Sequence, residues 1–231
     1  MTTHIPHIRA ITFDVGGTLI EPWPSVGHVY AEVAERQGLG KVSPEILNER
    51  FKAAWRGQSN FNYTREAWSA IVDETFRDLV SQSYCESFFP SLYERFAQAD
   101  AWRIFEDVEP TVSALAASGI RLGIISNWDE RLRPLLTALG LAKRFEVIVV
   151  SCEAGATKPS PLIFQMASKS FELPPEKILH IGDSSELDLA GAQAVGMQAL
   201  EINRRAAKPA ANQILSLTNL IPIIGSGRSG D

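Results

Sequence analysis

Cysteine is scarce in this chain, which has only Cys85 and Cys152 among its 231 residues. Two cysteines so far apart cannot build the paired framework of a small disulfide-rich domain, and they lack the spacing of a structural metal site. The first residues, MTTHIPHIRAITF, contain no charged segment followed by a long apolar one. We therefore expect no signal peptide and a reducing compartment, the cytoplasm.

An excess of basic residues is also missing. Lysine and arginine total 22 against 27 aspartate and glutamate, so the net charge is −5, and no basic run occurs. This balance argues against binding to nucleic acid or to an anionic membrane surface. No apolar stretch approaches membrane-spanning length. The hydrophobic content of 45% is enough for a large core with or without a smaller domain, and we expect a monomer or a homodimer.

The most informative stretch is IRAITFDVGGTL, which begins at Ile8. Its apolar, β-branched start predicts a buried strand that ends at Asp14. Gly16 and Gly17 follow, and they would let the backbone approach an anion closely. A carboxylate at this end of a buried strand points to the crevice where open α/β sheets bind ligands. Alone, Asp14 could equally be a turn residue that ends the strand.

The rest of the chain divides into a helical block and an alternating block. Residues 22–100 show helical periodicity and no strand pattern, with helices predicted over 25–37, 43–55, 64–79 and 88–97. Beyond them, strands are predicted over 121–126, 145–150, 178–181 and 198–202, and helices over 111–117, 127–139, 160–171 and 187–195. This alternation predicts an α/β fold, a doubly wound (Rossmann-like) parallel sheet. We therefore expect a core domain of residues 1–21 and 101–231, with an inserted all-helical cap domain of residues 22–100.

Polar side chains recur where the predicted strands end. Each has a structural explanation of its own: a helix cap, a solvated loop lysine, a turn residue or an acid in the first turn of a helix. The carboxyl ends of parallel strands share one edge of a sheet, however, so coincidence at every strand end is improbable. The residues concerned are Asp14, Ser126, Asn127, Lys158, Asp183 and Asp188.

Four segments in this order resemble the motifs of the haloacid dehalogenase (HAD) superfamily. They are FDVGGTL (13–19), IISNWD (124–129), TKPSPLIF (157–164) and HIGDSSELDLAGAQAVGM (180–197). The helical block directly after the first motif resembles the cap of the dehalogenase–phosphatase branch. The resemblance covers nearly the whole chain, and it implies a hydrolase that acts on a small phosphorylated substrate.

The resemblance also implies roles for single residues. Asp14 would attack phosphorus and form an aspartyl-phosphate. Gly17, Ser126 and Asn127 would hold the phosphoryl oxygens, and Lys158 would balance the charge of Asp14 and the phosphate. The implied cofactor is Mg²⁺, which prefers oxygen ligands. Its expected ligands are Asp14, the backbone carbonyl of Gly16, Asp183 and Asp188.

One position departs from the pattern of family phosphatases. They carry a second aspartate two residues after the nucleophile, where this chain has Gly16. The carbonyl ligand is kept, but the general acid–base is lost, and such a group typically contributes 10²–10⁴-fold. Glu21 and His28 are nearby in sequence, although a hinge or surface position suits them better.

Two branches of the family work without this aspartate. Dehalogenases carry an aromatic residue there and lack the Gly-Asp of the fourth motif, which this chain has at Gly182 and Asp183. Phosphonate hydrolases use a cap lysine, and the predicted cap offers Lys41 and Lys52, for which a solvated position is the more frequent case.

Two classes of function therefore remain. One is a Mg²⁺-dependent phosphatase that is weak or restricted to good leaving groups. The other is a non-catalytic or regulatory phosphate-binding protein with the same fold.

Overall fold

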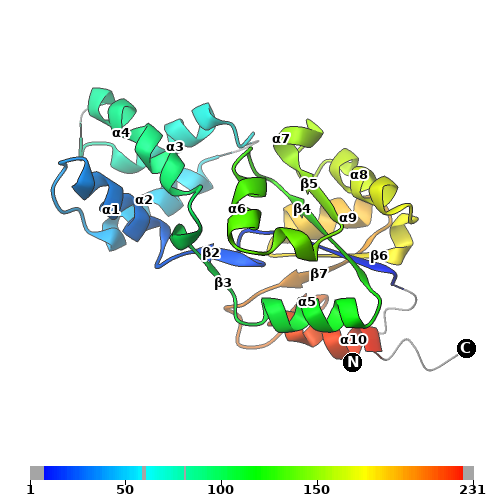
Figure 1. Ribbon diagram of the computed structural model, residues 1–231. Helices are drawn as coiled ribbons and strands as arrows, with labels where there is room; N and C mark the ends of the chain where they lie inside the picture. Colours follow the sequence, from blue (N-terminus) through cyan, green and yellow to red (C-terminus); the bar gives the residue numbers. More distant parts are fainter. Residues whose placement is uncertain (1–7, 59–60, 81, 226–231) are drawn as a thin grey trace, which may run out of the picture. The chain divides into compact units, whose positions relative to one another are not determined.

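The computed structural model describes residues 8–58, 61–80 and 82–225, so the ends of the predicted core domain lie outside the described residues (Figure 1). The chain forms two compact units. The α/β unit contains Met1–Ile20, Ile104–Trp128 and Gly140–Asp231, and the helical unit contains Glu21–Arg103 and Asp129–Leu139. The assignment of residues 22–100 to a separate cap domain stays a prediction.

The α/β unit is built on a six-stranded sheet in which every pairing is parallel. The predicted fold class is therefore confirmed. The sheet also contains a short edge strand that the sequence did not predict. In spatial order the strands are β5 (Val147–Val150), β4 (Arg121–Ser126), β1 (Ala10–Phe13), β6 (Ile178–Gly182), β7 (Gln198–Ile202) and β8 (Gln213–Ile214).

Helices cover both faces of this sheet. Figure 1 shows α5 (Val108–Ala117) and α10 (Leu220–Gly225) together on one side, and α8 (Pro161–Phe171) and α9 (Gly191–Ala194) on the other. Phe164 and Phe171 of α8 belong to a buried cluster with residues of β5, β6 and β7. Because the sheet is buried on both faces, its central strands are continuous apolar runs rather than alternating ones.

The strand order reverses at β1, which lies between β4 and β6. The register pairs Phe13 with Ile124 on one side and with Ile181 on the other. The chain segments that follow these three strands therefore begin at the same edge of the sheet. Such a reversal is where open α/β sheets bind ligands, because the connections leave in opposite directions and open a crevice.

The helical unit forms around its own core. Its helices are α1 (Val26–Arg36), α2 (Pro44–Arg56), α3 (Arg65–Phe76), α4 (Gln82–Arg95) and α6 (Leu132–Ala138). The side chains of Ser25, Ser43 and Thr64 accept hydrogen bonds from the first turns of α1, α2 and α3, as expected of N-cap residues. Short strands β2 (Ile20–Pro22) and β3 (Trp102–Ile104) pair where the chain enters and leaves the helical block.

Several predicted helices have different boundaries. The helix expected over 88–97 is Gln82–Arg95, the one expected over 64–79 ends at Phe76, and the one expected over 111–117 begins at Val108. The helix expected from Asn127 begins only at Leu132, and the helix expected over 187–195 is a π-helical segment, η4 (Ser185–Ala190), followed by α9. Asn127 does not cap α6, because its side chain is bound to a distant backbone segment. Among the residues that the structure describes, no helix is long and apolar enough to cross a membrane.

A carboxylate anchors the last helix of the α/β unit. Asp107, just before α5, accepts hydrogen bonds from Ser216 Oγ at 2.7 Å and from the Leu217 amide at 2.8 Å, and it pairs with Arg204 at 2.8 Å. Burial opposes ionisation, but Arg204 and these hydrogen bonds hold the pKa of Asp107 below its ordinary value. The carboxylate therefore stabilises the docking of the C-terminal segment.

Asp107→Asn is expected to lower the free energy of unfolding at pH 7 by about 2 kcal/mol, since hydrogen bonds to a charged group are lost. The folded-state pKa lies below the unfolded one, so this contribution is present above about pH 4 and disappears as the pH falls toward the folded pKa. Urea unfolding at pH 7 and at about pH 3 measures the difference. Glu109→Gln is the control, since its partner Arg144 is solvent-exposed; an equal loss for Asp107→Asn at both pH values would contradict the assignment.

Candidate active site

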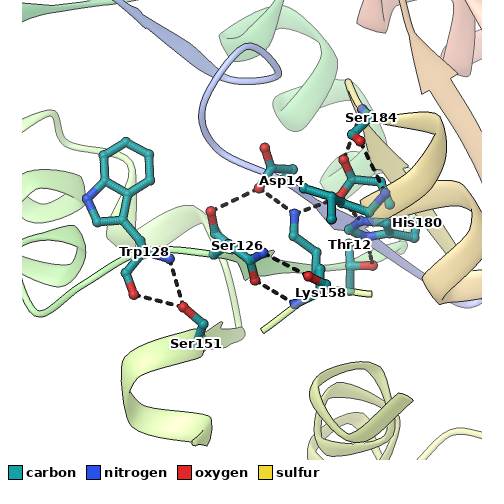
Figure 2. A network of polar contacts seen from close by, with 11 residues as sticks. Thr12, Asp14, Ser126, Trp128, Ser151, Lys158, His180 and Ser184 are labelled. Atoms are coloured by element: carbon teal, nitrogen blue, oxygen red, sulfur yellow. Dashed lines mark hydrogen bonds and ion pairs between the residues drawn. The ribbon is translucent and has the colours of Figure 1, made fainter. Parts of the chain in front are cut away.

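Asp14 lies at the centre of a buried polar network at the carboxyl edge of the sheet (Figure 2). Its backbone amide continues the sheet by donating to the carbonyl of Ile181 at 2.8 Å. Its Oδ1 accepts hydrogen bonds from Ser126 Oγ at 2.9 Å and from Lys158 Nζ at 2.6 Å. Burial raises the pKa of Asp14, while Lys158 opposes that shift. Lys158 is thus the group that favours the charged form needed for nucleophilic attack.

Lys158 is 4% exposed and lies between two carboxylates. Its Nζ is 2.6 Å from Asp14 Oδ1 and 2.6 Å from Asp188 Oδ1. Burial would lower the pKa of this lysine, but the two carboxylates raise it above its ordinary value. The ammonium therefore carries a fixed positive charge in the middle of the acidic cluster.

Asn127 fixes the backbone of Lys158 from both sides. Its Nδ2 donates to the Lys158 carbonyl at 3.1 Å, and its Oδ1 accepts from the Lys158 amide at 2.7 Å. A primary amide can satisfy one backbone donor and one acceptor at once. The side chain of Asn127 thus joins the end of β4 to the loop that carries the lysine, which explains why it does not cap α6.

Asp14, Asp183 and Asp188 together form the acidic cluster. One carboxylate oxygen from each lies within 4.8 Å of the others. Burial opposes ionisation of Asp188, but Lys158 and His180 hold its pKa below the ordinary range. Asp183 as a whole residue is exposed, but its carboxylate lies beside those of Asp14 and Asp188. Desolvation of this carboxylate and the negative charge of the other two raise its pKa to about 7. The clustered oxygens and this unfavourable charge suit a divalent cation with oxygen ligands.

Two glycines make the close approach of these carboxylates possible. A Cβ at Gly17 would lie 2.2 Å from Asp183 Oδ2, and Gly17 has a φ of +74°, a conformation that side chains disfavour. A Cβ at Gly182 would lie 2.1 Å from Asp188 Cγ. Gly16 differs, because its φ is outside the left-handed region and its Cβ would make only an ordinary contact, 3.4 Å from Trp128 Cζ3.

The sequence did not reveal the residues beneath this cluster. His180, fully buried in β6, contacts Asp188 Oδ1 through Nε2 at 3.0 Å and Thr12 Oγ1 through Nδ1 at 2.9 Å. Since a carboxylate only accepts, Nε2 carries a proton. Thr12 and His180 are register partners in neighbouring strands. The available signal was a polar residue in the middle of each of two buried apolar strands, where parallel sheets are normally apolar.

A second pair of contacts fixes the segment after β4. Ser151 Oγ accepts a hydrogen bond from the Trp128 amide at 3.0 Å and donates one to the Trp128 carbonyl at 2.9 Å (Figure 2). Ser151 is the first residue of α7 (Ser151–Ala154), directly after β5. The sequence analysis named neither residue. A serine hydroxyl can act as donor and acceptor together, so one side chain holds both backbone groups of Trp128.

The alternatives for the missing acid, Glu21 and His28, have other partners, and the two cap lysines that a phosphonate hydrolase could use are exposed. Glu21 pairs with Arg103, and the Nδ1 of His28 is 2.8 Å from the hydroxyl of Ser25. Lys52 is exposed and pairs with Glu49 at 2.7 Å, and Lys41 is exposed as well. The structure brings together at the sheet edge the residues predicted from the strand ends, with Gly17 beside them. They are Asp14, Ser126, Asn127, Lys158, Asp183 and Asp188.

Comparison with known proteins identifies the same family as the four sequence motifs. Residues 8–196 match the family of haloacid dehalogenase-like hydrolases. The chain belongs to this family. The haloacid dehalogenase-like hydrolase domain-containing protein 3 of Homo sapiens is 33% identical over an alignment 241 residues long, gaps included. The alignment covers 96% of this HAD chain and 95% of the relative.

Two further relatives of this HAD hydrolase are phosphatases by name. A phosphoglycolate phosphatase of Yersinia pseudotuberculosis is 28% identical over 190 residues, covering 82% of this chain and 78% of the relative. The crystal structure of a HAD phosphatase from Thermococcus onnurineus superposes with a TM-score of 0.68 at 26% identity, covering 96% of this chain and all of the other (100%). The resemblance inferred from the four motifs is confirmed.

Gly182→Ala is expected to destabilise this HAD hydrolase by about 1–3 kcal/mol, the usual cost of overpacking, because the new methyl group collides with Asp188. Gly57→Ala is the matched control, since the nearest atom to its Cβ is 3.5 Å away. Thermal unfolding followed by circular dichroism measures both. Equal melting temperatures for the two variants would show that the contact between Gly182 and Asp188 is not required.

Proposed function

We propose that this chain is a Mg²⁺-dependent phosphohydrolase that acts on a small phosphorylated metabolite through an aspartyl-phosphate on Asp14. The observation that carries the proposal is the pair of hydrogen bonds that Asp14 Oδ1 accepts from Ser126 and Lys158. Two further carboxylates lie beside it. A carboxylate so placed is a nucleophile next to donors for a transferred anionic group. The phosphatase relatives support the same class of reaction.

Each residue of the site has a part in this reaction. A carboxylate oxygen of Asp14 attacks phosphorus as the bond to the leaving oxygen breaks, and water then releases inorganic phosphate and restores Asp14. Ser126 and the backbone amide of Asn127 donate to the phosphoryl oxygens. Gly17, whose own amide donates to the Ile20 carbonyl at 2.8 Å, lets the backbone approach the phosphate closely. Lys158 balances the charge that gathers between Asp14 and the phosphate.

The acidic cluster would hold the magnesium ion. Asp14 and Asp183 are the proposed carboxylate ligands, Asp188 binds directly or through water, and Gly16 contributes its carbonyl. When bound, the ion offsets the negative charge of the carboxylates and of the phosphate. This requirement fits the raised pKa of Asp183, which is caused first by desolvation of the carboxylate and then by the negative charge of Asp14 and Asp188.

Gly16 restricts the substrates. With no side chain at this position, no carboxylic acid protonates the leaving oxygen from there, and the reaction depends on a leaving group that departs as a stable anion. Acyl phosphates, anhydrides and aryl phosphates have such leaving groups. A non-catalytic, phosphate-binding protein is the alternative, and the same observation at Gly16 favours it.

The two other branches of the family receive less support. A phosphonate hydrolase needs a buried, reactive cap lysine, whereas Lys52 is exposed and paired with Glu49 and Lys41 is exposed. A dehalogenase needs no metal, whereas this chain assembles Asp14, Asp183 and Asp188.

Hydrolysis of an aryl phosphate and of an alkyl phosphate in the presence of Mg²⁺ tests the proposal. We expect rapid release from the aryl phosphate, slow release from the alkyl phosphate because no acid assists, and no release by Asp14→Asn. Release of one equivalent of the aryl alcohol per chain without steady release of phosphate would mean that the phosphoryl group stays on Asp14, and it would favour the protein that does not turn over. Equal rates for both leaving groups would mean that another residue acts as the acid.

Magnesium affinity is expected to depend on pH. Asp183, with a pKa of about 7 in the metal-free protein, is protonated below that pH, and its proton competes with the cation. The apparent affinity should therefore rise about tenfold from pH 6 to pH 8, for one competing proton. Calorimetric titration measures it.

Asp183→Asn should weaken binding severely and remove this pH dependence. Glu186→Gln, which neutralises an exposed neighbouring carboxylate, should do neither. Unchanged affinity in Asp183→Asn would rule out the proposed ligands.

Gly16→Asp is expected to raise the rate on an alkyl phosphate by roughly 10²-fold, because it supplies the missing acid–base group. The backbone at residue 16 accepts a side chain without strain, and the new Cβ meets Trp128 at ordinary contact distance. Gly16→Asn is the matched control of equal size without a titratable proton. No gain in a folded, Mg²⁺-binding Gly16→Asp protein would show that the missing acid does not limit this chain.

A further inference from the structure

The space beside Gly16 is next to an aromatic ring. Trp128 Cζ3, at the edge of the indole, lies 3.4 Å from the point where a Cβ of residue 16 would be. In the phosphatases that this chain resembles, a proton donor for the leaving group occupies residue 16. Here residue 16 has no side chain, and the edge of an aromatic ring lies beside it.

The backbone that carries this ring is fixed on both sides. Trp128 is held through its amide and its carbonyl by Ser151 Oγ, at 3.0 and 2.9 Å. The preceding residue, Asn127, is bound to the backbone of Lys158. All of these residues belong to the α/β unit. The indole is thus carried by a backbone segment fixed next to the network of Asp14, and Figure 2 shows Trp128 joined to Ser151 beside that network.

We infer that Trp128 is a specificity-determining residue that selects an aromatic or heteroaromatic leaving group. The inference rests on the proposed function and narrows its substrate to phosphate esters of a planar ring. Two independent features of the site lead to it. The absence of an acid at Gly16 requires a leaving group that is stable as an anion, and delocalisation into a ring provides this stability. The half-buried indole provides a surface on which such a ring can stack.

The chemical step is unchanged by this contact. Asp14 attacks phosphorus, the bond to the aryl oxygen breaks, and its electron pair leaves with the aryloxide, which takes its proton from water. The indole contacts only the ring of the leaving group. Its contribution should therefore appear in the ratio of kcat/KM for aryl substrates to kcat/KM for non-aromatic substrates whose leaving groups are equally good.

Comparison of an aryl phosphate with acetyl phosphate tests the inference. Acetyl phosphate also has a good leaving group but no ring. For Trp128→Leu, the ratio of kcat/KM for the aryl phosphate to that for acetyl phosphate should fall roughly three- to tenfold, mainly through KM, as expected for the loss of one stacking contact. Trp128→Phe, which keeps a ring, should restore most of the ratio.

The matched control is Phe105→Leu, which removes another half-buried ring of the α/β unit, one that stacks on Arg204 at 3.8 Å. It should leave the ratio as in the wild type. Equal losses on both substrates in Trp128→Leu would show that the indole is only structural and would overturn the inference.

Binding without turnover separates this inference from the proposed function. In the Asp14→Asn background, calorimetry should show that an aryl phosphate binds more tightly than an alkyl phosphate, and that Trp128→Leu removes the difference. If the wild type hydrolyses neither substrate but the binding difference persists, the phosphohydrolase proposal fails and the aromatic selectivity stands. If hydrolysis proceeds and binding shows no aryl preference, the aromatic selectivity fails alone.

Discussion

The structure of the site depends on one buried ammonium group. Lys158 Nζ lies 2.6 Å from Asp14 and 2.6 Å from Asp188, in a place from which water is almost excluded. Without this charge, the two carboxylates would repel one another at low effective dielectric, and their pKa values would rise. Removing one partner of such a buried cluster leaves an uncompensated charge, which typically costs several kcal/mol. The contacts of Asn127 with the Lys158 backbone hold the segment that carries this ammonium group.

The three glycines around the carboxylates have different reasons to be glycine. Gly17 and Gly182 leave the room that the side chains of Asp183 and Asp188 occupy, so the acidic cluster requires them sterically. Gly16 has neither a left-handed backbone nor a collision at its Cβ position. The absence of an acid there is thus a chemical property of this chain and not a demand of its backbone. Under the proposed function, this is the position at which the reaction would differ from that of family phosphatases with an aspartate there.

The network beneath the site shows how the sheet supports the chemistry. Thr12 and His180 face each other across neighbouring strands, and His180 shares Asp188 Oδ1 with Lys158. Asp188 Oδ2 accepts from the backbone amide of Ser184 at 3.1 Å. The carboxylate is consequently oriented by one strand, through His180 of β6, and by two segments outside strands and helices, through Lys158 and Ser184. Buried polar networks of this kind hold one geometry because an unsatisfied member is costly.

The sequence alone determined the class of fold and predicted which strand-end residues lie together at one edge of the sheet. Apolar runs of strand length, each followed by a polar residue, were sufficient to place Asp14, Ser126 and Asp183 at one edge, because parallel strands must end together. The starts of the helices at Ser25, Ser43 and Thr64 could be predicted as well, since a cap residue contacts only the first turn of its own helix. These signals are local, or follow from topology.

Tertiary structure decided whatever depends on partners far apart in the chain. The sequence predicted Asn127 as a helix cap, but its partner is the backbone of Lys158, 31 residues away. It left Thr12 and His180 unassigned, although they are 168 residues apart and in direct contact. The contact of Trp128 with the space beside Gly16 likewise exists only once β1 and β4 are paired. Periodicity and local motifs do not predict such pairings, because the pairings arise from the packing of segments far apart in the chain.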